Sequence, residues 1–258
     1  MKETKAVLAV SFGTSFAETR QLTIDQIEKK IAHEISHPLY HAWTSKMILQ
    51  KIRERDHLVI PNVAEAFLQM KQDGIRNVYV QPTHVLPGIE NDRMEEDALR
   101  FRSDFETITF GNPLLTTTAD HQNFIRLFMD NYRSIPSTDA ILLMGHGTPH
   151  YVNTAYAALD YEFKDLGFPN VFVGTVEAYP DLHSVLNMLR NSSYHHIHLM
   201  PLMIVAGDHA NHDMAGNSPD SWQSILQANG YEVTCHLHGL GELPFVQDML
   251  VEHLKRVV

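Results

Sequence analysis

The sequence is short of cysteine, of positive charge and of long apolar runs. Cys235 is the single cysteine among 258 residues, which excludes an internal disulfide, a CxxC site and a disulfide-stabilised extracellular scaffold. No apolar run approaches the ~18 residues of a membrane-spanning helix. The formal net charge of −11 argues against a nucleic-acid-binding protein, because such proteins normally carry a stripe of basic side chains. We therefore expect neither a membrane nor a nucleic acid as partner.

Histidine, in contrast, is abundant. The 17 histidines nearly equal the 20 lysines and arginines combined, and imidazole both titrates near neutral pH and binds metals. Hydrophobic residues make up 44% of the chain, which is ordinary for a globular protein and excludes a disordered one. The first apolar stretch, residues 6–10, is shorter than most secretory signals, so we expect a cytoplasmic protein.

Short apolar runs alternate with amphipathic helical patterns along the whole chain. The predicted strands are residues 5–11, 39–43, 78–81, 107–110, 140–144, 171–175, 196–200 and 232–235. Helical patterns between them predict βαβ units and parallel sheets covered on both faces. Because the rhythm restarts after the polar segment 133–138, we predict an α/β protein with two similar parallel-sheet domains, residues 1–134 and 135–258, flanking a central cleft.

The two halves also resemble each other locally. Ser-Phe-Gly-Thr at residues 11–14 matches Gly-His-Gly-Thr at residues 145–148, which pairs Phe12 with His146. A second match pairs Glu90 with His209. Both segments follow predicted strands, where ligands bind in open α/β sheets. These matches predict a duplicated unit.

Three residues near strand ends in the second half are the candidate metal ligands. His146 lies between two glycines, which let a ligand approach the backbone and the imidazole together. Glu177 follows the next predicted strand, and His209 lies in a polar loop after another. A strand-end histidine, a helix cap and a solvated turn are the ordinary alternatives. A His/Glu/His set suits a borderline divalent metal such as cobalt, nickel, iron or zinc.

Other histidine patterns carry less weight. His33 and His37 belong to an HExxH match, but they project from the face opposite the buried isoleucines, and Pro38 follows, which disfavours a zinc protease. We interpret His196 and His198 as structural. The sequence contains no GxSxG, GxxxxGK[ST] or GxGxxG motif, so we expect no nucleotide cofactor.

The motifs VSFGTS (residues 10–15), MGHG (144–147), VEAYP (176–180) and MPLMIVAGDH (200–209) resemble those of the anaerobic-type sirohydrochlorin cobaltochelatases. These are single-chain, ATP-independent tetrapyrrole chelatases. The likeness spans nearly the whole chain, including Ser-Trp at 221–222 and GLGE at 239–242. It implies insertion of Co²⁺ into sirohydrochlorin, a step towards cobalamin.

The resemblance also implies roles for individual residues. His146, Glu177 and His209 would hold the cobalt, and His146 would also accept a proton. Phe12 and Glu90 would contact the substrate, with metal chemistry confined to the second half. An iron or nickel chelatase and a non-catalytic metal or tetrapyrrole carrier stay open as alternatives. Whether the chain forms a homo-oligomer is also left open.

Overall fold

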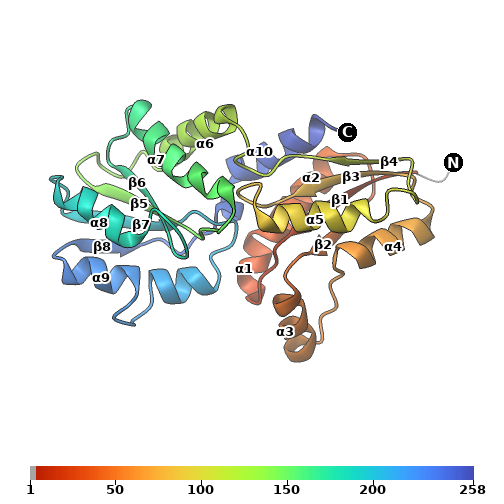
Figure 1. The fold of residues 1–258 in the computed structure, drawn as a ribbon, viewed down its shortest axis with the longest axis horizontal. Coiled ribbons are helices and arrows are strands. Elements are labelled where there is room, and N and C mark those ends of the chain that lie inside the picture. The colour runs from red at the N-terminus through yellow and green to blue at the C-terminus, as the bar shows by residue number, and fades with distance from the viewer. Residues whose placement is uncertain (1–3) are drawn as a thin grey trace. The chain divides into compact units, whose positions relative to one another are not determined.

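The computed structural model describes residues 4–258, which contain two four-stranded parallel sheets (Figure 1). The first has the order β2-β1-β3-β4 and the second the order β6-β5-β7-β8. The orders are equivalent, so β1 corresponds to β5 and β3 to β7, as the predicted duplication requires. The strands are β1 Lys5–Ser11, β2 Leu39–Trp43, β3 Asn77–Pro82, β4 Thr107–Phe110, β5 Ala140–Gly145, β6 Val171–Thr175, β7 His196–Pro201 and β8 Glu232–Cys235.

Helices connect the strands as βαβ units. In order along the chain they are α1 Ala17–Leu22, α2 Ile24–Glu34, α3 Lys46–Asp56, α4 Val63–Asp73, α5 Ile89–Leu99, α6 Thr118–Asn131, α7 Thr154–Asp165, α8 Leu182–Arg190, α9 Trp222–Ala228 and α10 Pro244–Lys255. Short turns of helix occur at Tyr151–Asn153 and Leu240–Glu242, and a π-helix, η2, at Ala210–Met214. Among the described residues, no helix combines the length and apolar character that crossing a bilayer requires.

The chain forms two compact units, residues 4–116 with 241–258, and residues 117–240. The predicted division after residue 134 differs from this arrangement at two places. Helix α6 packs against α7 and belongs to the second unit, although it precedes the polar segment taken as the boundary. Helix α10 packs against α2 and β3 and returns the C-terminus to the first unit. Both assignments depend on contacts distant in sequence.

Each sheet buries an apolar face against helices. In the first unit, Ala6, Leu8 and Val10 of β1 pack in one core with residues of α4 and α5. In the second unit, Leu142 and Met144 of β5 share a core with residues of α8, α9 and η2. Strands buried on both faces explain why β1 and β5 are almost continuously apolar in the sequence.

The buried His84, just after β3, makes the stability of the first unit depend on pH. Burial lowers the pKa of His84 from its ordinary 6.5 to about 4, and Glu90 and Asn91 oppose that shift only in part. Between those pH values the unfolded chain binds a proton that the folded chain does not. We therefore expect the free energy of unfolding to fall by roughly 3 kcal/mol as the pH is lowered from 7 to 4.

Urea unfolding of the wild type and of His84→Gln at several pH values measures this effect. The variant is expected to lose less stability on acidification than the wild type. The exposed His183 on α8 supplies the matched control, since His183→Gln is expected to keep the wild-type slope. Identical pH slopes for the wild type and His84→Gln would contradict the prediction.

Candidate metal centre

The three predicted metal ligands follow three adjacent strands of the second sheet. Strand β5 lies between β6 and β7, and all three run parallel. The register pairs Gly145 with Thr175 and Met144 with Pro201, so the carboxyl ends of the strands align. His146 comes directly after β5, and Glu177 comes two residues after β6. His209, after β7, is the residue before the π-helix η2.

The turn around His146 is tied to the loop that carries Glu177. The backbone N–H of Glu177 donates to the carbonyl of His146 at 2.9 Å, and Val176 donates to Gly145 at 3.0 Å. Gly147 has a φ of +86°, and a Cβ built there would lie 2.8 Å from the backbone nitrogen of Ala178. Glycine is therefore required at position 147 both by its backbone conformation and by the close approach of the two segments.

The side chains of His146, Glu177 and His209 converge. His146 Nδ1 lies 3.7 Å from Glu177 Oε2, and His209 Nε2 lies 3.9 Å from Glu177 Oε1. The two imidazole rings are perpendicular, with centroids 4.6 Å apart. One ligand atom from each residue lies within 4.8 Å of the others. With two nitrogens and one oxygen, the group can bind a borderline divalent metal after small side-chain rotations.

Hydrogen bonds orient both imidazoles. His146 Nδ1 lies 2.8 Å from the carbonyl oxygen of Gly147, and His209 Nδ1 lies 2.6 Å from Asp213 Oδ2. Carbonyl and carboxylate oxygens accept, so each Nδ1 is the donor, which leaves Nε2 as the nitrogen of each ring that can bind a metal. The same arrangement is common for metal-binding histidines, whose second nitrogen is held by an oxygen.

Asp213 is a neighbour of His209 that was not among the residues predicted from the sequence. In the structure η2 brings Asp213, four residues after His209, against the ring of His209. His212 instead bonds to Asp208 and has a side chain 68% exposed, so it does not join the group. Residues four positions apart, such as His209 and Asp213, are neighbours only if the segment is helical. The sequence predicted a loop there, so this spacing did not identify the contact.

Tyr156 of α7 is a further buried neighbour that the sequence did not single out. Its ring fills the space beside Gly145, where a Cβ would lie 2.3 Å from Tyr156 Cε1. Burial raises the pKa of Tyr156 to about 12, and hydrogen bonds with the backbone of Gly147 and His146 oppose this only in part. The phenol therefore stays protonated at neutral pH and supports the turn rather than acting as a base.

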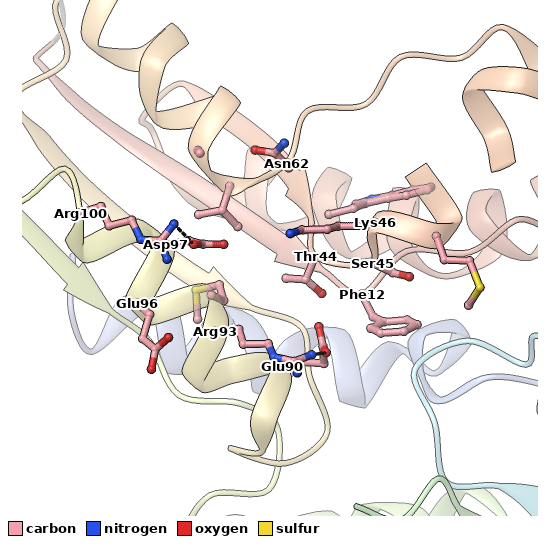
Figure 2. A pocket seen from close by; sticks show the side chains of 15 residues that line it. Phe12, Thr44, Ser45, Lys46, Asn62, Glu90, Arg93, Glu96, Asp97 and Arg100 are labelled. Carbon is pink, nitrogen blue, oxygen red and sulfur yellow. Dashed lines mark hydrogen bonds and ion pairs between the residues drawn. The ribbon is translucent and has the colours of Figure 1, made fainter. Parts of the chain in front are cut away.

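The first unit contains a separate pocket of about 760 Å³ (Figure 2). Phe12, at the end of β1, and Glu90, in the first turn of α5, both line it. Gly13 has a φ of +98°, close to that of Gly147, so the turn after β1 matches the turn after β5 in conformation. Three cationic side chains also line the pocket, namely Lys46, Arg93 and Arg100. Arg93 pairs with Glu90 at 2.9 Å.

The HExxH match does not form a metal site in the structure. Helix α2 ends at Glu34, so His33 and His37 do not lie on one helix. The side chain of His33 is 84% exposed, whereas the ring of His37 stacks on Tyr79 with centroids 5.9 Å apart. The argument against a zinc protease, made from the buried isoleucines, is consistent with this geometry.

Comparison with known proteins identifies the family. The model of the family described as cobalt chelatase (CbiK) matches residues 5–258, which is nearly the whole chain. This chain belongs to the CbiK family.

Two relatives of the family are similar over almost their full lengths. The chain is 36% identical to the sirohydrochlorin cobaltochelatase of Salmonella typhimurium over 255 residues, covering 98% of this chain and 96% of that protein. It is 29% identical to the sirohydrochlorin cobaltochelatase CbiKC of Nitratidesulfovibrio vulgaris, covering 98% of this chain and 90% of that protein.

The fold is that of chelatases. The structure of SirB from Bacillus subtilis with Fe³⁺ superimposes with a TM-score of 0.68 at 15% identity, covering 98% of this chain and 95% of SirB. At that identity the likeness concerns the fold alone. It confirms the predicted chelatase-like architecture of two parallel-sheet α/β domains.

Proposed function

We propose that this CbiK-family protein inserts Co²⁺ into sirohydrochlorin, and that His146, Glu177 and His209 bind the ion before its transfer. The observation that carries the proposal is the convergence of these three side chains at the carboxyl edge of one sheet in a chain of this family. Two relatives of matching length are named for that activity.

The donor set suits an ion that must be released. Imidazole and carboxylate ligands bind Co²⁺ firmly enough to position it, whereas a site of several thiolates would retain it. The three side chains are 30–51% exposed, so the ring nitrogens of a substrate can reach the ion. Each protein ligand is then exchanged for a pyrrole nitrogen as the ion enters the macrocycle.

Proton transfer follows from the same exchange. Insertion of a divalent ion requires two pyrrole N–H protons to leave the ring. The Nε2 lone pair of His146 cannot bind the ion and a proton at once, so departure of Co²⁺ frees His146 as a base. A neutral imidazole accepts a proton efficiently near neutral pH. Glu177 or His209, freed in the same step, can take the second proton.

The carboxylates of the substrate need positive partners that the overall charge of −11 does not supply. The pocket of the first unit is lined by Lys46, at the start of α3, and by Arg93 and Arg100, in α5 and at its C-terminal end (Figure 2). We assign carboxylate recognition to these side chains, and the apolar contact of the ring to Phe12. Glu90 holds Arg93 in place by its ion pair.

The direct test mixes the purified protein with sirohydrochlorin and Co²⁺ and follows the absorbance change of metallation. We expect a rate that is proportional to protein concentration and exceeds the spontaneous rate over many turnovers. Equal rates with and without protein would reject the proposal, and a single stoichiometric binding event would indicate a carrier. Because the donor set also accepts iron and nickel, competition among the three ions identifies the preferred metal.

A further inference from the structure

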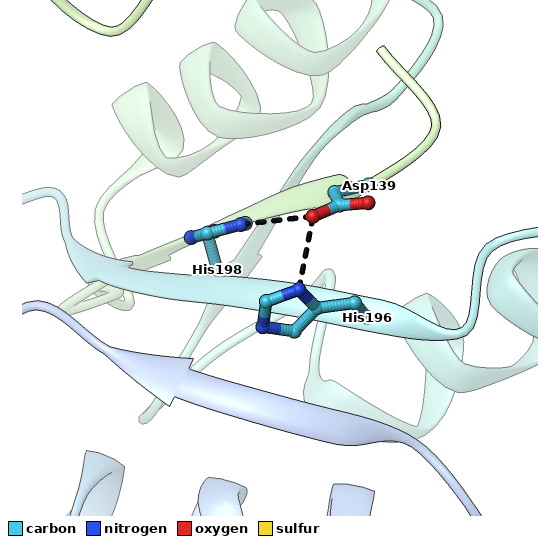
Figure 3. A group of neighbouring side chains, drawn as sticks. All are labelled: Asp139, His196 and His198. Carbon is cyan, nitrogen blue, oxygen red and sulfur yellow. Dashed lines mark hydrogen bonds and ion pairs between the residues drawn. The ribbon is translucent and has the colours of Figure 1, made fainter. Parts of the chain in front are cut away.

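A second cluster of metal-binding side chains lies at the opposite end of the sheet in the second unit (Figure 3). Asp139 immediately precedes β5, and His196 and His198 lie at the start of β7. His146 is seven positions after Asp139, which corresponds to roughly 20 Å along an extended strand. The cluster is therefore distinct from the group formed by His146, Glu177 and His209.

The three side chains share one face of the sheet. Ile197 and Leu199 of β7 point into the apolar core with α8 and α9, so His196 and His198 project from the other face. His196 Nδ1 lies 2.9 Å from Asp139 Oδ2, and His198 Nε2 lies 3.2 Å from the same oxygen. The imidazole centroids are 4.5 Å apart.

These separations match those between the ligands of one metal ion. With metal–ligand distances of about 2.0–2.2 Å, neighbouring ligand atoms of a tetrahedral or octahedral site lie roughly 2.9–3.5 Å apart. One ligand atom from each of the three residues lies within 4.8 Å of the others. A single divalent ion that replaces the two protons donated to Asp139 would keep all three groups nearly where they are.

The outer nitrogens of both rings already have suitable partners. His196 Nε2 lies 2.8 Å from Thr234 Oγ1, and His198 Nδ1 lies 3.0 Å from His236 Nε2. When Nδ1 of His196 and Nε2 of His198 bind a metal, these outer nitrogens carry hydrogen and donate to Thr234 and His236. Such outer contacts fix the tautomer and orientation of metal-binding histidines.

We propose that Asp139, His196 and His198 form a second site for a borderline divalent metal ion, such as Zn²⁺ or Co²⁺, at the amino-terminal edge of the second sheet. Two imidazoles and one carboxylate favour these ions over calcium and magnesium. A bound ion would join β5 to β7. Exposures of 12–27% leave the three side chains accessible to an ion from solvent.

The test measures Co²⁺ binding to the full chain after removal of metals with a chelator. We expect the wild type to bind two ions per chain by equilibrium dialysis. The double variant His196→Asn/His198→Gln keeps a hydrogen-bond donor near each original nitrogen but removes both ligand lone pairs, and we expect it to bind one ion and still insert cobalt. The double variant His146→Ala/His209→Ala is expected to bind one ion and to lose insertion.

His195→Gln is the matched control, because His195 is exposed, adjoins the cluster and is not part of it. It is expected to bind as many ions as the wild type. An unchanged ion count in His196→Asn/His198→Gln, or no binding by His146→Ala/His209→Ala, would overturn the second site whatever the outcome for chelatase activity.

A further measurement does not depend on the folding of any variant. Crystals of the wild type soaked in Co²⁺ are expected to show an anomalous difference peak between Asp139 Oδ2, His196 Nδ1 and His198 Nε2. Absence of that peak, with a peak at His146 and His209, would overturn the proposal.

Discussion

His146→Ala is expected to lower kcat for cobalt insertion by about 10²–10⁴-fold, the usual contribution of a positioned general base. On the proposed mechanism, the variant loses the Nε2 lone pair that would hold Co²⁺ and then accept a pyrrole proton. Because the side chain is 46% exposed and follows the strand, its removal is expected to leave the fold intact, which circular dichroism can check. Steady-state metallation of sirohydrochlorin measures the loss.

Two further measurements distinguish a loss of catalysis in His146→Ala from a structural defect. His212→Ala removes an exposed imidazole three residues from His209 and is expected to keep the wild-type kcat. Added imidazole is expected to restore part of the rate of His146→Ala, because the vacated position is open to solvent, whereas a purely structural defect would not respond. A wild-type kcat in His146→Ala would rule out its role as base and ligand.

Glu177→Gln is expected to raise KM for Co²⁺ at least ~10-fold, since loss of an outer contact to a ligand alone costs 10–100-fold in affinity. Glutamine keeps the shape of the side chain but removes the negative charge that lies between the imidazoles of His146 and His209. We expect kcat at saturating Co²⁺ to fall less than KM rises, because His146 remains available as a base. Initial rates over a range of Co²⁺ concentrations separate the two constants.

The matched control for Glu177→Gln is Asp165→Asn, which neutralises an exposed carboxylate at the end of α7 in the same unit. It is expected to leave KM for Co²⁺ unchanged. An equal change in both variants would mean that overall charge, and not coordination by Glu177, sets the affinity.

The strands were the most predictable part of the fold. All eight appear, and five of them, among them β1, β6 and β8, have the predicted bounds. Buried parallel strands are short apolar runs bounded by turn residues, so their signal is local. Helix ends were less accurate. The helical patterns in the sequence begin at Asp92 and Asn123, whereas α5 and α6 begin earlier, at Ile89 and Thr118. Capping and tertiary contacts set those ends.

The sequence near a helix does not show to which of the two units that helix belongs. Helix α10 has an ordinary amphipathic pattern, and nothing in that pattern specifies which sheet it covers. Its contacts with α2 join residues more than two hundred positions apart, including the ion pair of Lys30 with Asp248 at 2.6 Å, and its contacts with β3 join residues more than 160 positions apart. The polar segment near residue 134 is a loop within the second unit. Loops and domain boundaries are both polar, so the composition of the segment could not distinguish between them.

The residue pattern alone was enough to select His146, Glu177 and His209, because parallel strands bring their carboxyl ends to a common edge and each residue follows such an end. It also paired Phe12 with His146 through the repeated turn. Asp213, Tyr156 and the grouping of Asp139 with His196 and His198 emerged from the folded chain. Those contacts depend on a π-helical turn, on side-chain packing and on strand register. None of these three features produces a periodic pattern in the amino-acid sequence, so only the tertiary structure could show the contacts.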